Sequence, residues 1–165
     1  MRGDLLLQRV FSVAATAAQV ALAVWLLAQA AGGEIFVYRL GNWQVPFGIA
    51  LMLDRLSALM LLLTAILAMA TLIFSFARWG RAGPRFHGLF LLLLMGVNGA
   101  FLTGDIFNLY VWFEIMLITA MGLLAIGRTR AQLDGVFKYA VLNLFSTLLF
   151  LLAVGMLYGV AGSLN

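Results

Sequence analysis

Residues 49–77 read IALMLDRLSALMLLLTAILAMATLIFSFA, a stretch whose only charged residues are Asp54 and Arg55 near its start. The hydrocarbon core of a bilayer is about 30 Å thick, and a helix needs about 20 apolar residues to cross it. This stretch is long enough to cross that core with a tilt, or to extend past it. It therefore predicts a transmembrane helix.

The whole chain has the composition of a membrane protein. Of its 165 residues, 65% are hydrophobic and 10% are charged, and its mean hydropathy is +1.10. A soluble domain is about one quarter charged, so these charges are too few for a surface that faces water. The pI of about 10.1 does not indicate nucleic-acid binding, because the Arg residues lie between apolar runs and form no basic face.

The residue types also exclude several kinds of site. The chain has no cysteine and a single histidine, His87, so disulfides, thiol chemistry and a His-based or Cys-based metal site are not expected. It has no flavin, quinone or iron–sulfur motif, and we predict no cofactor. No nucleophile, base and oxyanion donors converge in the sequence, so an independent enzyme is not expected.

Five stretches are long and apolar enough, or nearly so, to cross a membrane. They are residues 11–31, 49–77, 86–103, 106–127 and 136–161. We predict an all-α integral membrane protein with about five transmembrane helices in one domain, residues 1–165. The third and fourth helices should be close antiparallel neighbours, because Gly104 and Asp105 alone connect them.

The positive charges predict the orientation of these helices. Eight of the ten Lys and Arg residues lie before the first span, between the second and third spans, or between the fourth and fifth: Arg2, Arg9, Arg78, Arg81, Arg85, Arg128, Arg130 and Lys138. Arg39 and Arg55 lie on the other side. The positive-inside rule places the amino terminus in the cytoplasm and the carboxyl terminus outside the cell membrane.

The first span has a second interpretation. Arg2 and Arg9 precede an apolar run that ends in Ala28-Gln29-Ala30, which has the small-x-small form of a signal-peptidase site. The run of about 21 residues is longer than the 7 to 15 of a typical signal peptide, and further spans follow it. Length favours a transmembrane helix, and cleavage of residues 1–30 is the alternative.

The polar connection at residues 34–47 predicts a short β-hairpin that faces outward. Residues 35–40 and 43–45 have β-prone side chains, and Gly41-Asn42 between them suits a two-residue turn. Tyr38 and Trp43 would lie at the membrane interface. An irregular loop is the alternative.

One acid lies deep in a predicted span. Glu114 is nine residues from the turn at Asp105, which places it about 13 Å into the membrane at 1.5 Å per residue. An ionised carboxylate there costs at least about 2.5 kcal/mol, so Glu114 must be protonated, paired with a cation or in contact with water. We predict a proton-coupling role, with a neutral acid that makes an interhelical hydrogen bond as the alternative.

Lys138, the only lysine, is the second candidate for proton coupling. It enters the fifth helix from the cytoplasmic side, where it could relay protons or extend to the headgroups as an anchor. Several polar residues are candidate walls of a hydrated path or, alternatively, interhelical hydrogen-bonding groups. They are Asn98 and Asn108 around the outer turn, and Asn143, Ser146 and Thr147, which share one face of the fifth helix.

Three segments resemble a known family. Residues 54–60 (DRLSALM), 94–114 (LMGVNGAFLTGDIFNLYVWFE) and 138–143 (KYAVLN) are similar to the amino-terminal half of the D subunit of the Mrp-type multisubunit Na⁺/H⁺ antiporters. That superfamily includes the proton-pumping subunits of respiratory complex I and of membrane-bound hydrogenases. The resemblance implies that Glu114 is a mid-membrane glutamate that couples protons, that Lys138 occupies a basic position of the sixth helix of that family, and that residues 34–47 form an outer hairpin.

The resemblance also implies what the chain lacks. Family members have one more helix before Phe11, and beyond the position of Asn165 they have a broken helix whose lysine partners Glu114, followed by an inverted repeat. We therefore expect a fragment, a truncated product or one piece of a split subunit, and we do not expect it to complete a proton path by itself.

The resemblance implies a subunit of a monovalent cation/proton antiporter, with other antiporter subunits, the lipid bilayer, protons and a cation as partners. A proton-pumping subunit of a complex I-like NADH:quinone oxidoreductase or hydrogenase is the first alternative. A membrane scaffold without a transport role is the second.

Overall fold

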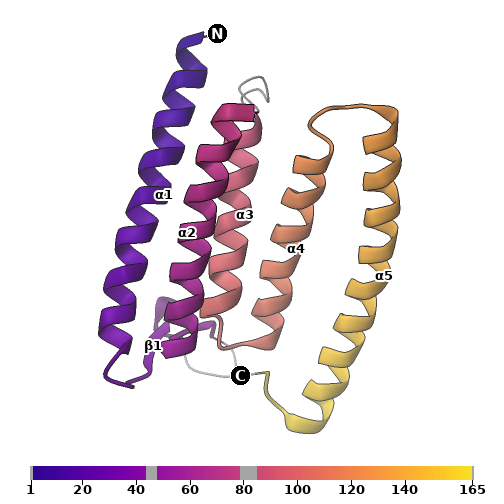
Figure 1. Cartoon of the computed structure of the whole chain (residues 1–165). Helices are drawn as coiled ribbons and strands as arrows, with labels where there is room; N and C mark the ends of the chain where they lie inside the picture. The colour runs from indigo at the N-terminus through magenta and orange to yellow at the C-terminus, as the bar shows by residue number, and fades with distance from the viewer. Residues whose placement is uncertain (1, 44–47, 79–84, 165) are drawn as a thin grey trace.

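The computed structural model describes residues 2–43, 48–78 and 85–164. Within these residues the fold consists mainly of five long helices (Figure 1). The helices are α1 (Arg2–Ala30), α2 (Arg55–Arg78), α3 (Arg85–Leu102), α4 (Ile106–Leu124) and α5 (Arg130–Ala161). All five are long and apolar enough to span a membrane. The predicted all-α membrane fold with five spans is confirmed.

The helices run alternately up and down, so the two ends of the chain lie at opposite ends of the bundle (Figure 1). Helix α1 packs against α2, α3 packs against α4, and α5 packs against α4 at the edge of the bundle. Most of the α5 surface that faces away from α4 is therefore exposed, and Val154 is the one buried residue of this helix.

Three helix starts differ from the predicted spans. Helix α1 begins at Arg2, nine residues before the predicted span. Helix α2 begins at Arg55 rather than Ile49, because Ala50–Leu53 form a strand. Helix α5 begins at Arg130 rather than residue 136, because Thr129 and Gln132 form a capping box in which each side chain binds the backbone of the other. This cap satisfies backbone N–H groups and makes a polar first turn helical.

A two-stranded antiparallel sheet lies between α1 and α2, as predicted. Strand β1 (Phe36–Arg39) pairs with β2 (Ala50–Leu53), so that Phe36 lies opposite Leu53. The prediction that residues 43–45 form the second strand was wrong at Trp43, which is not in a strand; residues 44 and 45 lie outside the described part of the chain. Gly41 and Asn42 do not form the expected two-residue turn between strands: they lie in a short 3-10 helix (Leu40–Asn42), with φ of 61° and 57°, within the longer connection from β1 to β2.

Strand β2 joins the hairpin to the rest of the bundle. Its other edge contacts the α3–α4 turn, where the Gly104 N–H donates to the Ala50 carbonyl oxygen at 2.9 Å and Leu51 pairs with Thr103. Ala50 and Leu53 are buried, whereas all of β1 is exposed. A short apolar run such as 49–53 is equally compatible with a buried strand and with a helix start, so periodicity alone misassigned it.

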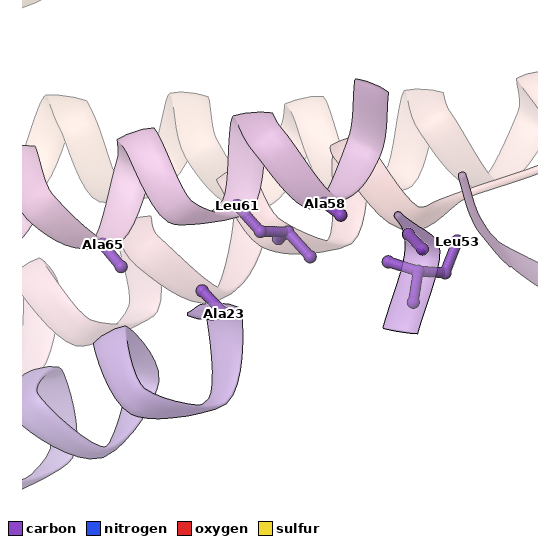
Figure 2. Close-up of a cluster of buried hydrophobic side chains, with 6 residues drawn as sticks. Ala23, Leu53, Ala58, Leu61 and Ala65 are labelled. Carbon is purple, nitrogen blue, oxygen red and sulfur yellow. The ribbon is translucent and has the colours of Figure 1, made fainter. Parts of the chain in front are cut away.

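Small side chains let the helices approach closely. Buried Ala23 of α1 lies beside Ala58, Leu61 and Ala65 of α2, and Leu53 of β2 closes this cluster (Figure 2). Small residues are common where transmembrane helices pack, because no bulky side chain separates the backbones.

The α3–α4 pair is close for the same reason. A Cβ atom added to Gly96 would lie 2.7 Å from Met116 Cγ, and one added to Gly99 would overlap the indole ring of Trp112. These glycines therefore set how closely α3 approaches α4.

Asp54 and Arg55 hold the start of α2. A carboxylate oxygen of Asp54 accepts a 2.7 Å hydrogen bond from the Ser57 backbone N–H, and this bond lowers the pKa of Asp54 below its ordinary value. Arg55 Nη2 donates to the Ala31 carbonyl oxygen at 2.9 Å, just after the end of α1. The pair is structural, and it fixes the junction between α1 and α2.

Candidate functional site

Glu114 lies near the middle of α4, whose start is fixed by Asp105. The Asp105 carboxylate accepts a 2.9 Å hydrogen bond from the Asn108 backbone N–H and caps the helix. Nine residues further on, at about 1.5 Å per residue, Glu114 is about 13 Å along the helix axis. The side chain is half-buried.

The carboxylate of Glu114 is bonded to the neighbouring helix. The Thr147 hydroxyl of α5 donates a 2.9 Å hydrogen bond to Glu114 Oε1. Among the residues that the structure describes, Thr147 is the one hydrogen-bond partner of Glu114, and no Lys or Arg forms an ion pair with it. The acid therefore has a polar contact but no neutralising charge in this part of the protein.

The Glu114–Thr147 pair lies in an open groove of about 210 Å³ between α4 and α5. Its lining residues are Tyr110, Phe113, Glu114 and Leu117 of α4 and Asn143, Ser146, Thr147 and Phe150 of α5. The walls are mostly apolar and aromatic: Tyr110 stacks on Phe150 at 6.2 Å between ring centroids, and Phe113 meets the same ring edge-on at 6.4 Å.

The predicted polar face of α5 lines this groove. The Ser146 hydroxyl donates to the Leu142 carbonyl oxygen of its own helix at 3.0 Å. Asn143 Nδ2 is buried and has no hydrogen-bond partner among the described residues. A buried N–H group without a hydrogen-bond partner is energetically costly, so binding of water or another acceptor in the groove would stabilise this amide.

Three other sequence candidates lie away from the groove. Lys138 is exposed, nine residues and about 13 Å along α5 from Thr147. Asn108 is buried, and its Nδ2 donates to Thr103 Oγ1 at 2.8 Å, which ties α4 to the α3–α4 turn. Asn98 lines a different cavity, between α1 and α3.

The sequence candidates did not include the aromatic wall of the groove. Tyr110 lies four residues before Glu114, and residues four apart share one face of a helix, so the spacing could have indicated Tyr110. Phe150 lies three residues after Thr147 and four after Ser146, so the same spacing could have indicated it, whereas its contact with Tyr110 depends on how α5 packs against α4.

Comparisons with known proteins find similarity to subunits of cation/proton antiporters. The chain is 55% identical, over 129 residues, to the D subunit of a probable K⁺/H⁺ antiporter of Rhizobium meliloti. It is 40% identical over 167 residues to the D subunit of the Na⁺/H⁺ antiporter of Bacillus subtilis. The structure superimposes on a chain of the Mrp complex of a Dietzia species with a TM-score of 0.90 and 32% identity.

The chain is thus similar to antiporter D subunits. The matches cover 78%, 100% and 98% of this chain for the Rhizobium, Bacillus and Dietzia proteins. They cover only 24%, 34% and 31% of those three proteins, in the same order. The chain therefore spans about a third or less of the length of these relatives. No protein-family model matches it.

The structure also superimposes on a chain of a respiratory complex. The membrane-bound sulfane sulfur reductase of an archaeon gives a TM-score of 0.87 at 32% identity, over 98% of this chain and 35% of the other. The fold is therefore common to antiporter and respiratory assemblies. With five apolar helices, the chain is a multi-pass membrane protein.

The part of the chain that the structure describes shows no metal site. Within residues 2–43, 48–78 and 85–164, no group of three or more His, Cys, Asp or Glu side chains lies together as metal ligands. What the groove offers is a single carboxylate with a hydroxyl partner, which suits proton binding.

Proposed function

We propose that this chain forms part of the D subunit of a multisubunit cation/proton antiporter, in which Glu114 takes up and releases protons. One observation carries the proposal. A carboxylate near the middle of a membrane helix opens into a groove and is held by the Thr147 hydroxyl, with no ion pair among the described residues.

The Thr147 hydroxyl suits a proton-binding carboxyl group. A hydroxyl donates one hydrogen bond and accepts others, so it can donate to the ionised carboxylate and accept from the protonated acid. The contact between α4 and α5 can therefore persist in both protonation states of Glu114. Removal of the proton changes the charge in the groove without breaking the helix pair.

The groove gives Glu114 a way to exchange protons with water. A charge in the hydrocarbon core is costly, and intramembrane acids usually face a water-filled cavity or a partner charge. The open groove and the unpartnered Asn143 amide support hydration on this side of α4. A cation that neutralises Glu114 would come from a segment or subunit outside the described residues.

Two further features belong to this proposal. The excess of Lys and Arg on one side supports an amino terminus in the cytoplasm and a carboxyl terminus outside. The other subunits of the antiporter are the proposed partners, and Lys138 is a proposed relay on the cytoplasmic side. The relatives carry both K⁺ and Na⁺ in their names, so either cation is a proposed substrate.

The test measures cation-driven proton movement in membrane vesicles that contain the complete complex. Glu114→Ala should abolish the movement driven by Na⁺ and by K⁺, while Glu114→Asp, which keeps an acid, should retain part of it. Glu34→Ala is the matched control, because Glu34 is an exposed acid outside the groove. Full activity in Glu114→Ala would overturn the proposed role.

A second candidate function is a proton-pumping subunit of a redox-driven respiratory complex. The likeness to a chain of the sulfane sulfur reductase complex favours it. Purification of the intact complex distinguishes the two: redox subunits that copurify, together with proton movement driven by an electron donor, would support the pump. Proton movement driven by a cation gradient alone would support the antiporter.

A further inference from the structure

A second polar region lies between α1 and α3, away from Glu114. Two side-chain amide atoms there are buried without a hydrogen-bond partner among the described residues: Gln19 Nε2 on α1 and Asn98 Oδ1 on α3. Buried polar atoms almost always form hydrogen bonds with protein groups or with ordered water, so each of these two atoms is expected to have a hydrogen-bond partner.

Both amides line the same open cavity of about 470 Å³. Its other lining residues are Ala15, Ala18 and Leu22 of α1 and Leu91, Leu94 and Met95 of α3. The small alanine side chains leave this space between the helices. The cavity shares no lining residue with the Glu114 groove, so the two regions are separate.

The two unpartnered atoms are chemically complementary. Gln19 Nε2 is a donor and Asn98 Oδ1 is an acceptor, and a molecule that both accepts and donates can satisfy the pair. Water does both, and it needs a polar cavity with room for it and two or more partners. Lipid chains offer neither a donor nor an acceptor to the amides.

A neighbouring cavity extends the polar region toward the end of the bundle where α1 begins. It measures about 430 Å³ and shares Leu91 with the first cavity, and its lining includes Gln8, Ser12 and His87. The Ser12 hydroxyl donates to the Gln8 carbonyl oxygen at 2.8 Å, so Ser12 Oγ is left to accept from His87 Nδ1 at 3.0 Å. On α3 the polar groups of the two cavities are therefore His87 and Asn98, about 16 Å apart along the helix, and α1 contributes Gln8, Ser12 and Gln19.

We propose that the α1–α3 interface binds water molecules, which bridge Gln19 to Asn98 inside the membrane and reach them along the polar groups around His87. This site gives the protein a hydrated track apart from the Glu114 groove. The proposal does not depend on the function of Glu114, because it concerns water binding alone.

Cysteine accessibility tests the proposal directly, because the chain has no cysteine of its own. Ala18→Cys places a thiol in the cavity without removing either amide. Ala17→Cys is the matched control, since Ala17 is at the same depth and exposed but does not line the cavity. The complete complex in membrane vesicles is treated with a charged, water-soluble methanethiosulfonate, and labelling of this chain is followed over time.

The thiolate is the reactive form, and it forms in water and not in lipid. We expect Ala18→Cys to react at least tenfold faster than Ala17→Cys. Equal, slow rates would mean that lipid or a side chain of another helix fills the cavity, and would overturn the proposal.

A second set of variants tests whether the amides hold the water. Gln19→Leu and Asn98→Leu, introduced together with Ala18→Cys, should lower the labelling rate to that of Ala17→Cys. An undiminished rate would overturn the assignment to Gln19 and Asn98. Neither result depends on antiport, so a failure here is distinguishable from a failure of the proposed function.

Discussion

Thr147 of α5 and Glu114 of α4 are joined by a 2.9 Å hydrogen bond near the middle of their helices. The two residues are 33 positions apart in sequence, so the bond exists only because α5 returns antiparallel to α4. Among the described residues, Thr147 is the one hydrogen-bond partner of Glu114, and most of the other groove walls are apolar. Removal of this hydrogen bond therefore affects Glu114 more directly than any other single change in the groove.

Replacement of Thr147 by valine removes the hydroxyl and keeps the shape of the side chain. Hydrogen bonds between transmembrane helices contribute about 0.6 kcal/mol on average, which corresponds to about a threefold change. We expect Thr147→Val to slow cation-driven proton movement about threefold and Thr147→Ser to restore it. Ser146→Ala is the control, since the Ser146 hydroxyl lines the same groove but binds its own helix. Wild-type rates in Thr147→Val would contradict a role for the bond.

Substitution of Gly99 should destabilise the α3–α4 pair. A methyl group at Gly99 overlaps the Trp112 ring, and such overpacking costs about 1 to 3 kcal/mol. Gly99→Ala should lower the thermal midpoint of the purified protein, monitored by tryptophan fluorescence. Gly88→Ala on the same helix has open space around its added methyl group and should leave the midpoint unchanged or raise it. Equal midpoints for the two variants would show that α3 and α4 are not packed so closely.

The cap at Asp54 predicts a loss of stability in acid. The hydrogen bond from the Ser57 N–H lowers the pKa of Asp54 in the folded protein below its usual 3.8. The stabilisation is therefore present above pH 3.8 and is lost as the pH falls through the lowered pKa. Thermal midpoints measured across this range should show the loss in the wild type. Asp54→Asn, which keeps a capping side chain but does not titrate, should lack this component. The same acid dependence in Asp54→Asn would assign it to other groups.

The proposed orientation predicts the activity of reporter fusions. Alkaline phosphatase, which is active only outside the cytoplasm, should be active when fused after Asn42 in the β1–β2 connection. The same reporter should be inactive when fused after Arg128, between α4 and α5, because that connection is on the positively charged side. The reverse pattern would place the amino terminus outside.

The number of apolar helices and the place of Glu114 along its helix could be predicted from the sequence because both depend on local composition and helix rise. The strand Ala50–Leu53 could not, since its partners Phe36–Arg39 and the Thr103 turn lie far away along the chain. The same limit applied to the groove. The shared face of Asn143, Ser146 and Thr147 follows from helical spacing, whereas its contact with Tyr110 and Glu114 follows from packing.

By itself the sequence determined that five stretches are long and apolar enough to cross a membrane and that one carboxyl group lies near the middle of the fourth. Hydrophobic transfer and a rise of about 1.5 Å per residue suffice for both statements. Only the tertiary structure decided which polar groups meet: Glu114 with Thr147, Asn98 in a cavity with Gln19, and Lys138 exposed away from both. Those pairings depend on the rotation of each helix about its axis and on close approach at small residues such as Gly99, which no single segment encodes.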